Sequence, residues 1–466
     1  MVTSACVPRL KLYTLRDLPV MPQLTRLSSD HRRAMEVVAH VLPFRSNNYV
    51  VDELIDWQRI PEDPMFQLTF PQPGMLDEEH FRRMADALER KPAAKRLRRI
   101  AEEIRRELNP HPEGQIEHNT PLLGDQPVLG VQHKYRQTCL VFPSAGQTCH
   151  AYCSFCFRWA QFVGMRDLKL ATDESMGFRD YLRRHREVTD VLLTGGDPLV
   201  MRADVLARYI DPLLKGDMDH IRTIRIGTKA LSYWPYRLLT DDDSGELLRL
   251  FERIVSCGKH LAIMAHFNHW KELSTEAVRQ ATGRLRGAGA VIRTQSPLVR
   301  HINDDADVWA RLWTEQVHLG CIPYYMFVER NTGAQRYFKV PLYRALEIHR
   351  EAAARCSGLA RTARGPVMSA LPGKVVVDGV AEIQGEVVFS LSFLQARNAA
   401  WCRQPFHAQF DPSACWLNEL RPAFGATEFF YESELAALLG SRVPGSTCLD
   451  RMPPDALAAE AEPTPM

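Results

Sequence analysis

Three closely spaced cysteines are the residues of this chain best suited to do chemistry. Cys149, Cys153 and Cys156 follow the pattern C-x3-C-x2-C within the segment 148–158, so their thiolates can bind one metal centre. A structural zinc ion closes with four ligands, and a [4Fe–4S] cluster normally takes one cysteine for each iron. Three cysteines would leave one iron open to an exogenous ligand. The alternatives are a zinc ion completed by His150 or a remote ligand, and three unrelated core cysteines.

The surrounding sequence predicts the elements that position this cysteine loop. From about residue 137, short apolar runs alternate with amphipathic segments, which is typical of βα units with a parallel sheet. The expected strands are 138–142, 188–194, 221–227, 260–266, 291–294 and 322–328, and the expected helices are 175–185, 202–214, 245–257, 275–287, 304–318 and 342–354. Six such units favour an α/β fold with an open, partial (βα)6 TIM-like barrel, in which chemistry gathers at the carboxyl ends of the strands.

Polar residues stand at the ends of four of these strands. Thr194, Gly195, Gly196 and Asp197 follow the second strand, where glycines let the backbone approach a ligand closely and the carboxylate offers an acceptor. Arg225 belongs to the end of the third strand, His266 to the fourth and Gln295 to the fifth. A Gly-Gly-Asp-Pro turn is common, and a lone histidine is more often a core residue. Their shared place on the expected active rim makes all seven residues candidates for cofactor binding.

The cysteine pattern after the first strand of a βα barrel resembles the signature of the radical S-adenosylmethionine (SAM) superfamily. This resemblance implies that Cys149, Cys153 and Cys156 bind a [4Fe–4S] cluster and that SAM chelates the open iron. The segment that ends in Asp197 resembles the superfamily element that binds the amino group of SAM. One electron from the cluster would then cleave SAM, and the 5′-deoxyadenosyl radical would abstract a hydrogen atom from the substrate. A flavodoxin or ferredoxin-type reductant is the implied electron donor.

A closer resemblance is to lysine 2,3-aminomutase-like enzymes and covers about residues 45–370. The segments that carry it, in the same order as in that family, are His133–Arg136, Leu192–Leu199, Arg225–Thr228, His266–His269, Thr294–Ser296 and Pro323–Tyr325, with Asn47–Tyr49 and Glu62–Pro64 upstream. The family moves an α-amino group to the β carbon and holds the amine as an imine with pyridoxal phosphate (PLP) on a lysine. Arg158 resembles the arginine that binds the substrate carboxylate, and Tyr135 is a further candidate for substrate binding.

The chain departs from this family at the PLP lysine. Arg364, before Gly365-Pro366-Val367-Met368, stands where the lysine is expected, and arginine does not form the imine because it stays protonated. Lys374 is the nearest substitute, although it is ten residues late and is expected to begin a strand. The family's acidic residues for the distal ammonium are also replaced, one of them by Arg330. Positive charge at Arg330 and Arg364 would suit an acidic, phosphorylated or carboxylated group.

Composition and length set the remaining expectations. The 466 residues carry a net charge of +2, which gives no indication of nucleic-acid binding, and there is no long apolar run or signal-peptide core. The eleven cysteines then favour a cytoplasmic protein with free thiols and ligands over a disulfide framework. The expected organisation is a helical N-terminal region (1–130), a barrel (131–365), a small C-terminal extension with strands (366–452) and a disordered tail (453–466).

The sequence therefore predicts a radical SAM enzyme that acts on an amino acid or a related small polar metabolite without lysine-anchored PLP. One alternative is a PLP-dependent amino acid 2,3-aminomutase that uses Lys374. An alternative of another class is a non-catalytic iron–sulfur or zinc-binding protein. The superfamily resemblance also allows a homo-oligomer, although the sequence shows no interface stripe, and neither the substrate nor the product is encoded in a readable motif.

Overall fold

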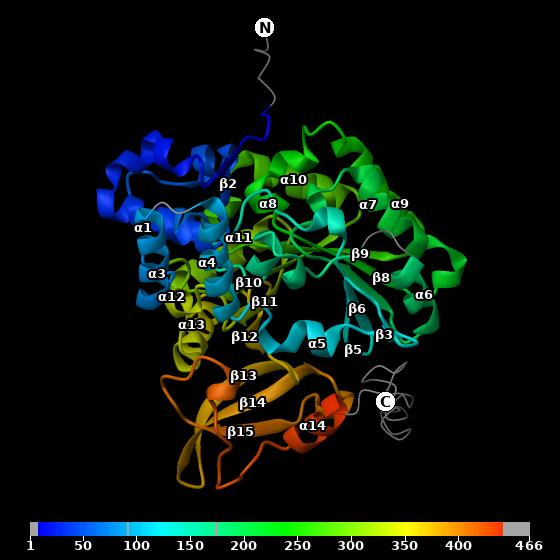
Figure 1. Cartoon of the computed structure of the whole chain (residues 1–466). Helices are drawn as coiled ribbons and strands as arrows, with labels where there is room; N and C mark the ends of the chain where they lie inside the picture. The colour runs from blue at the N-terminus through cyan, green and yellow to red at the C-terminus, as the bar shows by residue number, and fades with distance from the viewer. Residues whose placement is uncertain (1–7, 91–92, 173–175, 441–466) are drawn as a thin grey trace.

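The computed structural model describes residues 8–90, 93–172 and 176–440 of the chain. The predicted tail at 453–466 lies outside the described residues. A mixed α/β body forms the upper part of the view in Figure 1, and the C-terminal strands lie below it. No helix among the described residues is long and apolar enough to cross a membrane.

An eleven-stranded sheet organises the molecule, in the spatial order β15-β14-β13-β12-β11-β10-β9-β8-β7-β6-β5. Strands β6 to β12 pair parallel with one another, whereas β5 joins β6, and β13 to β15 join β12 and each other, in antiparallel pairs. The strands of this sheet are β5 (Val131–Tyr135), β6 (Thr138–Val141), β7 (Asp190–Leu193), β8 (Thr223–Thr228), β9 (His260–His266), β10 (Val291–Leu298), β11 (Ile322–Val328), β12 (Arg364–Ser369), β13 (Gly373–Ile383), β14 (Glu386–Ala396) and β15 (Pro405–Gln409). The sheet is open, because its edge strands β5 and β15 do not pair with each other.

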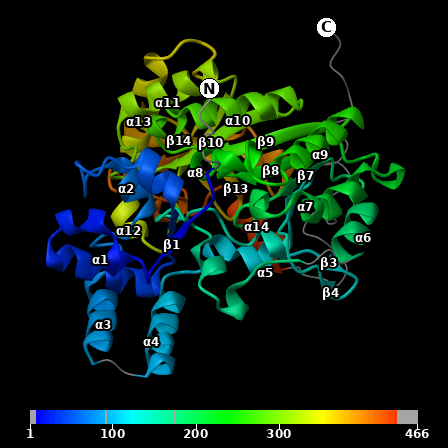
Figure 2. The ribbon, with the colours of Figure 1, turned by 90° about the horizontal axis from the view of Figure 1, so that it is seen from above.

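Helices that alternate with the parallel strands cover the outer face of the sheet, as the view from above shows (Figure 2). They are α6 (Met176–Arg184), α7 (Ala203–Ile210), α8 (Ala230–Tyr233), α9 (Ser244–Ser256), α10 (Glu276–Gly287), α11 (Ala306–His318), α12 (Gln335–Phe338) and α13 (Leu342–Ala354). Side-chain caps fix where two of them begin, because Thr275 accepts a hydrogen bond from the first turn of α10 and Asp305 does so for α11.

The two faces of the parallel strands differ in character. Along β8 and β10 every second residue is fully buried, and Ile224, Ile226 and Ile292 supply the apolar side. The alternate positions carry Arg225, Arg293 and Gln295 and are only half-buried. A closed (βα)8 barrel fills its interior with apolar side chains. The inner face of this sheet instead carries polar side chains, which can form hydrogen bonds and ion pairs with a bound molecule.

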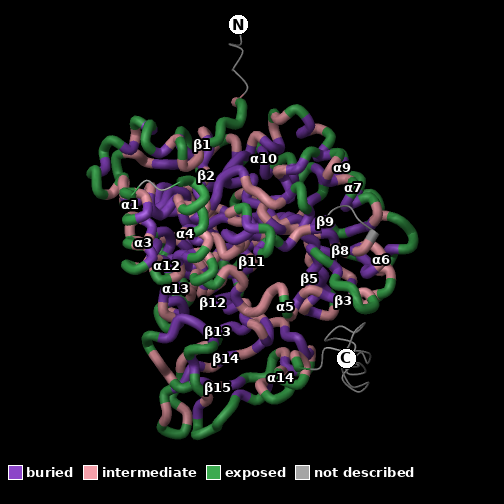
Figure 3. The backbone as a smooth tube through the Cα atoms, viewed as in Figure 1, coloured by how far each residue is buried: buried purple, intermediate pink, exposed green. Residues whose placement is uncertain are grey.

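The N-terminal region is mostly helical and packs against one side of the barrel, at the left of Figure 1. It contains α1 (Ser29–Val41), α2 (Pro64–Thr69), α3 (Glu78–Glu89), α4 (Ala94–Glu107) and α5 (Gln115–Asn119), with the short strand pairs β1 (Leu12–Thr14) with β2 (Arg45–Asn47) and β3 (Leu122–Leu123) with β4 (Gln126–Pro127). One large apolar core runs from these helices into the barrel, which appears as continuous buried chain in Figure 3.

The C-terminal strands have an apolar core of their own, built around Phe389, Phe393 and Trp416. The last described helix, α14 (Glu432–Gly440), covers this core by contributions from Leu435 and Leu438. Glu113 of the N-terminal region accepts hydrogen bonds from the backbone N–H of Leu371 and from Trp416 Nε1. The extension is therefore tied to the start of the chain as well as to β12.

The structure confirms the expected order of alternating strands and helices from β6 to α13. Strands β9 and β11 and helix α13 have the predicted bounds, and the expected strands after residue 366 are also found, with Lys374 near the start of β13. The predicted helix 202–214 ends as an α-helix at Ile210 and continues as a 3-10 turn, because Pro212 lacks the N–H that an α-helix needs. The sequence did not predict β5, β12 or β15.

Candidate functional site

The cysteine loop follows β6, at the carboxyl end of the parallel strands. Cys149, Cys153 and Cys156 are half-buried free thiols. Burial raises the pKa of all three, to about 12 for Cys156, and the neighbouring thiols raise the pKa of Cys149 and Cys156 further. The three groups are thus close enough to interact electrostatically, and a bound cation would favour their thiolate forms.

The donor set of this loop consists of three thiols and fits an iron–sulfur cluster. Among the residues that the structure describes, no three His, Cys, Asp or Glu side chains converge on one metal position. A [4Fe–4S] cluster normally takes one thiolate for each iron. The three half-buried thiols match the ligand type of such a cluster with one iron left open.

The N-terminal region holds this loop in place. Arg45 Nη1 donates to the backbone oxygen of Cys149 at 3.2 Å and also to Thr148 Oγ1. Asn47 Nδ2 donates to the backbone oxygens of His150 at 3.1 Å and Tyr233 at 2.9 Å, so a single amide joins the loop to α8. Neither residue was assigned a role from the sequence, although Asn47 belongs to the segment Asn47–Tyr49 that carries the family resemblance. Ser46 and Asn47 are completely buried, which only the structure shows.

The glycines after β7 are required for contact with the cysteine loop. Gly195 has a φ of +142°, and a Cβ there would lie 2.2 Å from the side chain of Gln147. A Cβ on Gly196 would lie 2.4 Å from the backbone of Thr148, the residue before the first cysteine. The two glycines therefore let the turn pack directly on the chain that carries the ligands.

The Asp197 carboxylate lies at the centre of a buried network. It accepts hydrogen bonds from Thr228 Oγ1 at 2.7 and 2.9 Å and from the backbone N–H groups of Leu199 at 2.9 Å and Lys229 at 2.8 Å. Burial raises its pKa, although these donors oppose the shift. Asp197 thus joins the ends of β7 and β8, and its predicted role in SAM binding stays a prediction.

A second buried network lies behind the cysteine loop and was not predicted. Lys229 Nζ donates to Glu272 Oε1 at 2.6 Å, to Asn268 Oδ1 at 3.0 Å and to the backbone oxygen of His266 at 3.2 Å. Its ammonium also lies 4.6 Å from the ring centroid of Tyr233, whose hydroxyl is hydrogen-bonded to Cys153 Sγ at 3.1 Å. The Tyr233 side chain therefore contacts both the buried Lys229–Glu272 ion pair and Cys153, a candidate cluster ligand.

Two other predicted residues face each other on the neighbouring strands β9 and β10. His266 and Gln295 are register partners in this parallel pair, so their side chains lie on the same face. The His266 ring packs edge-on against Phe155 of the cysteine loop, with centroids 6.2 Å apart. Burial lowers the pKa of His266 far below its ordinary value, which keeps the imidazole neutral at neutral pH. Thr194 lies at the same end of the sheet, at the end of β7.

A basic group of residues lies deeper along the strands. Arg225 Nε donates to Asp190 Oδ1 at 2.7 Å and is therefore neutralised within the fold. Lys374 Nζ donates to Gln395 Oε1 and lies 5.0 Å from the ring centroid of Tyr135. Burial, reinforced by Arg225 and nearby arginines, lowers the pKa of Lys374 to about 7. Its amine is therefore partly neutral at physiological pH.

Arg364 differs from the other basic residues by its exposure. It begins β12, and its guanidinium carbon lies 4.9 Å from the ring centroid of Tyr324 and 5.2 Å from that of Tyr325. Both contacts are cation–π contacts at the edge of the interior. Where the resemblance places the family's PLP lysine, this chain has a guanidinium that stacks on two tyrosines.

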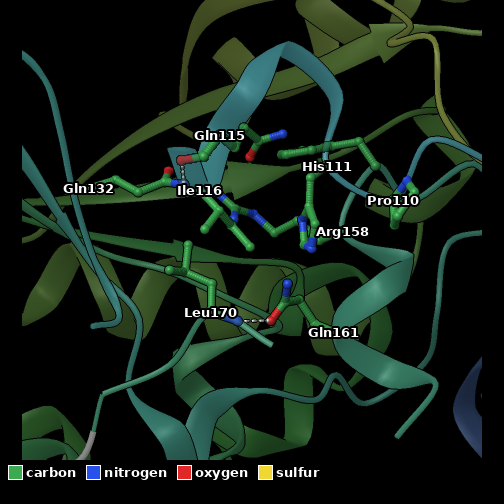
Figure 4. Close-up of a pocket in the computed structure, with 9 residues that line it drawn as sticks. Pro110, His111, Gln115, Ile116, Gln132, Arg158, Gln161 and Leu170 are labelled. Atoms are coloured by element: carbon green, nitrogen blue, oxygen red, sulfur yellow. Dashed lines mark hydrogen bonds between the residues drawn. The ribbon is translucent and has the colours of Figure 1, made fainter. Parts of the chain in front are cut away.

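Arg158 connects the cysteine loop with the basic group. Its guanidinium carbon lies 4.5 Å from the ring centroid of Phe142 and 4.9 Å from that of Phe157, and Arg330 lies 4.5 Å from the same Phe157 ring. Burial lowers the pKa of Arg158 to about 9, and the charge of Arg330 adds to the shift. Arg158 lines a small pocket together with Phe157, His111, Ile116, Gln132 and Gln161 (Figure 4).

The structure thus arranges the predicted residues in two sets that meet at Arg158. The first set surrounds the cysteine loop at the carboxyl ends of the strands, and Arg330 follows β11 at this same end. The second set consists of Tyr135, Arg225 and Lys374, which belong to the strands β5, β8 and β13 themselves. Electrostatic contacts link Arg158 with Cys156 on one side and with Arg330 on the other. This arrangement can hold a cluster and a small anionic molecule next to each other.

Relatives of known name match this chain. The chain is 32% identical over 370 residues to a protein of Aquifex aeolicus that is provisionally named an L-lysine 2,3-aminomutase, and the match covers 79% of this chain and 85% of that protein. The chain belongs to the lysine 2,3-aminomutase family. It is therefore a member of the radical SAM superfamily of enzymes, although no family model matches it.

Other members of the lysine 2,3-aminomutase family match over a shorter segment. The L-lysine 2,3-aminomutase of Clostridium subterminale is 30% identical over 48% of this chain and 50% of its own length. The glutamate 2,3-aminomutase of Clostridioides difficile is 30% identical over 46% of this chain and 47% of its own length. The match thus spans about half the length of these two relatives. A radical SAM methyltransferase from Sphaerobacter thermophilus covers 50% of this chain and 68% of its own with 17% identity and a TM-score of 0.33, which is too weak a likeness to support an argument.

Proposed function

We propose that this member of the lysine 2,3-aminomutase family cleaves SAM reductively at a [4Fe–4S] cluster and abstracts a hydrogen atom from a small polar substrate, without lysine-anchored PLP. The observation that carries the proposal is the loop of three half-buried thiols at the carboxyl end of β6, which Asn47 contacts through a hydrogen bond and Gly196 through close backbone packing. A radical SAM chemistry needs this number of thiolates and one open iron.

The proposed partial (βα)6 barrel consists of β6 to β11 and their helices, within 131–365. The N-terminal region (1–130) would support the cysteine loop, and the extension (366–452) would close the barrel from below. A flavodoxin or ferredoxin-type protein would supply the low-potential electron. These proposals rest on the contacts of Arg45 and Asn47 with the loop and of Glu113 with the extension.

Each part of the site has a proposed task. When bound, the cluster would supply the electron that cleaves SAM into methionine and a 5′-deoxyadenosyl radical. Cys149, Cys153 and Cys156 would hold it, and the turn after β7 would place its backbone beside the amino-acid end of SAM. Neutral His266, packed on the cysteine loop, and Gln295 beside it would bind other parts of SAM.

The substrate would lie on the inner face of the sheet, between the cluster and the basic group. Arg158 would bind its carboxylate, because a planar guanidinium donates two parallel hydrogen bonds to such a group. The rings of Phe142 and Phe157 pack on the guanidinium and remove part of its surface from water, which strengthens that interaction. Tyr135 and Arg364 would contact the rest of the substrate.

A second candidate function is a PLP-dependent aminomutation that uses Lys374. The observation that favours it is a buried amine with a pKa lowered to about 7, because imine formation requires a neutral amine. Against it stands the hydrogen bond of this amine to Gln395 and the guanidinium at the family's lysine position.

One experiment separates these functions. The protein, purified and reconstituted without oxygen, is assayed for iron and for 5′-deoxyadenosine after addition of dithionite and SAM, and its spectrum is recorded before and after borohydride. We expect about four irons per chain, formation of 5′-deoxyadenosine and no PLP band. Replacement of Cys149, Cys153 or Cys156 by Ala should abolish all iron signals, whereas the exposed Cys257→Ala control should retain them.

Two outcomes would change the proposal. A PLP band that borohydride fixes in the wild type but not in Lys374→Met would support the aminomutase. A protein that binds iron and never cleaves SAM would support a non-catalytic iron–sulfur protein, and full iron loading in the Cys149→Ala variant would contradict the ligand assignment.

A further inference from the structure

One segment of the N-terminal region does not contribute to the apolar cores of the protein. It comprises residues 109–119, here named the lid segment, and its helix α5 lies between the barrel and the C-terminal strands (Figure 1). No residue between Leu108 and Leu123 belongs to an apolar core of the described chain. Segments with few buried apolar contacts open locally at a low cost in free energy. The lid segment is therefore held in place chiefly by its hydrogen bonds.

The lid segment borders the pocket at Arg158. Four of its residues line this pocket together with Arg158 (Figure 4), namely Pro110, His111, Gln115 and Ile116. Arg158 is the residue to which the proposed function assigns the carboxylate of the substrate. The position of the lid segment thus decides how far this guanidinium is open to a molecule from outside.

Hydrogen bonds to the barrel fix the start of the lid segment. Thr332, in the loop after β11, donates from Oγ1 to the backbone oxygen of Asn109 and accepts a hydrogen bond from Trp159 Nε1 at 2.9 Å. Trp159 follows the cysteine loop in the sequence, so this end of the lid segment is tied to the chain that carries the thiols. Gln132 Nε2 of β5 donates to the backbone oxygen of Gln115 at 3.0 Å, which is one bond that opening would break.

Arg397 of the C-terminal extension fixes the other end. This buried side chain donates to the backbone oxygen of His118 at 3.2 Å and to Asn119 Oδ1 at 2.6 Å. It also donates to the backbone oxygen of Leu371 at 2.9 Å, within the extension. Both ends of the lid segment are therefore anchored, and only its middle is able to lift.

Glu113 holds this middle part against the extension. Its Oε1 atom accepts a hydrogen bond from Trp416 Nε1 at 2.8 Å, and its Oε2 atom accepts one from the backbone N–H of Leu371. Glu113 has a φ of +62°, and Asn109 has a φ of +51°. A left-handed backbone is tolerated by asparagine but is strained for glutamate. Release of Glu113 from the extension would relieve this strain, which is typical of segments that switch between two positions.

We infer that residues 109–119 form a lid over the Arg158 pocket, which opens when Glu113 is released from Trp416 and Leu371. The C-terminal extension is then the latch of this lid. The inference rests on the proposed function for what enters the pocket, but it concerns a movement of the chain and not the cleavage of SAM. A closed lid keeps water away from the reacting molecule, and an open lid admits it.

Hydrogen–deuterium exchange of the full chain, followed by mass spectrometry of peptides that cover 109–119, tests the inference. Trp416→Phe removes the indole N–H and keeps a ring in the core. We expect its lid peptides to exchange at least about 10-fold faster than those of the wild type, because a hydrogen bond to a charged group is lost. Trp401→Phe is the matched control, since Trp401 is buried in the same core and donates to Glu434 instead, and its lid peptides should exchange as in the wild type.

A second pair of variants changes the lid segment and leaves the core of the extension intact. Glu113→Gln replaces one of the two acceptor oxygens by an amide nitrogen and should also speed up exchange of the lid peptides. Glu117→Gln makes the same chemical change at an exposed glutamate of α5 and should leave the exchange unchanged. This pair tests the inference even where Trp416→Phe does not fold.

Modification of Arg158 by phenylglyoxal measures access to the pocket directly. The rate is mapped by mass spectrometry and is compared with that of Arg344, a half-exposed arginine of α13, in the same sample. We expect Trp416→Phe and Glu113→Gln to raise the rate at Arg158 relative to Arg344, and the two control variants to leave this ratio unchanged.

Three results would overturn the inference. They are unchanged exchange of the lid peptides in both latch variants, faster exchange without faster modification of Arg158, and equal acceleration in the peptides of β8 to β10, which would show that the whole chain unfolds. Neither measurement requires the cluster or SAM. A protein that never forms 5′-deoxyadenosine would therefore contradict the proposed function and leave this inference standing.

Discussion

Removal of the Lys229 ammonium should destabilise the protein and disturb the cysteine loop together. The change is Lys229→Met, which keeps the length and the apolar stem of the side chain but deletes the charge. Glu272 is completely buried, and its carboxylate would lose the 2.6 Å bond to Lys229 while it kept the N–H donors of Asn268 and His269. A carboxylate that is left in the core without its counter-charge costs about 3–5 kcal/mol.

This free energy corresponds to a measurable change in melting temperature. For 466 residues the unfolding entropy is about 1 kcal/mol per kelvin, so the variant should melt about 3–5 °C below the wild type if the chain unfolds in one step. Urea unfolding at neutral pH checks the free energy directly. The Lys229→Met/Glu272→Gln double variant should regain part of the loss, because it removes the orphan charge and keeps an acceptor for the backbone donors.

Two results would contradict the prediction for Lys229→Met. A melting temperature of Lys229→Met within 1 °C of the wild type would show that the ion pair is not a net contributor. A double variant that is less stable than the single would show that the loss comes from packing and not from an uncompensated charge. Lys215→Met, at an exposed lysine, is the matched control and should leave the free energy of unfolding unchanged within about 0.5 kcal/mol.

Three further predictions concern the site. Gly196→Ala should lower the iron bound per chain at least about two-fold, because its Cβ would lie 2.4 Å from neighbouring backbone, whereas Gly216→Ala, with no atom within 4 Å, should load normally. The free energy of unfolding of the wild type should rise as the pH rises from about 7 to 10, because in this range Lys374 is protonated in the unfolded chain but not in the folded chain. Lys374→Met should flatten this rise in urea titrations at each pH. Tyr233→Phe should lower the reduction potential of the cluster in an EPR titration, because it removes the hydroxyl 3.1 Å from Cys153 Sγ.

Local patterns in the sequence were sufficient to predict most of the parallel strands and the helices between them. Strands β9 and β11 are mostly apolar runs between polar turns. Their bounds could be predicted because a strand that is largely buried appears in the sequence as a short apolar run. The cysteine loop was found for the same reason, since its meaning depends on spacing within eight residues. The strand β12 was missed because Gly365 and Pro366 are usually turn residues.

Partners that are distant in the sequence could not be predicted. Asn47 bonds to residues 103 and 186 positions away, and no local pattern indicates either contact. The same holds for Tyr233 and Cys153, which are 80 residues apart. Arg330 shows the limit most clearly, because the sequence supports a charge at this position but does not show whether that charge has a partner. In the structure its Nη1 atom is buried and has no hydrogen-bond partner among the described residues.

The hydrogen bond between Glu113 and Trp416 has a consequence for how the chain folds. It joins residues 303 positions apart, and for a flexible chain a loop of that length costs about 5 kcal/mol to close. The apolar core of the extension must offset this entropy, so the cost falls on a segment that is synthesised after the parallel strands. We expect the body of the protein to form first and the C-terminal strands to dock last, which would leave the interior accessible from below while the chain matures.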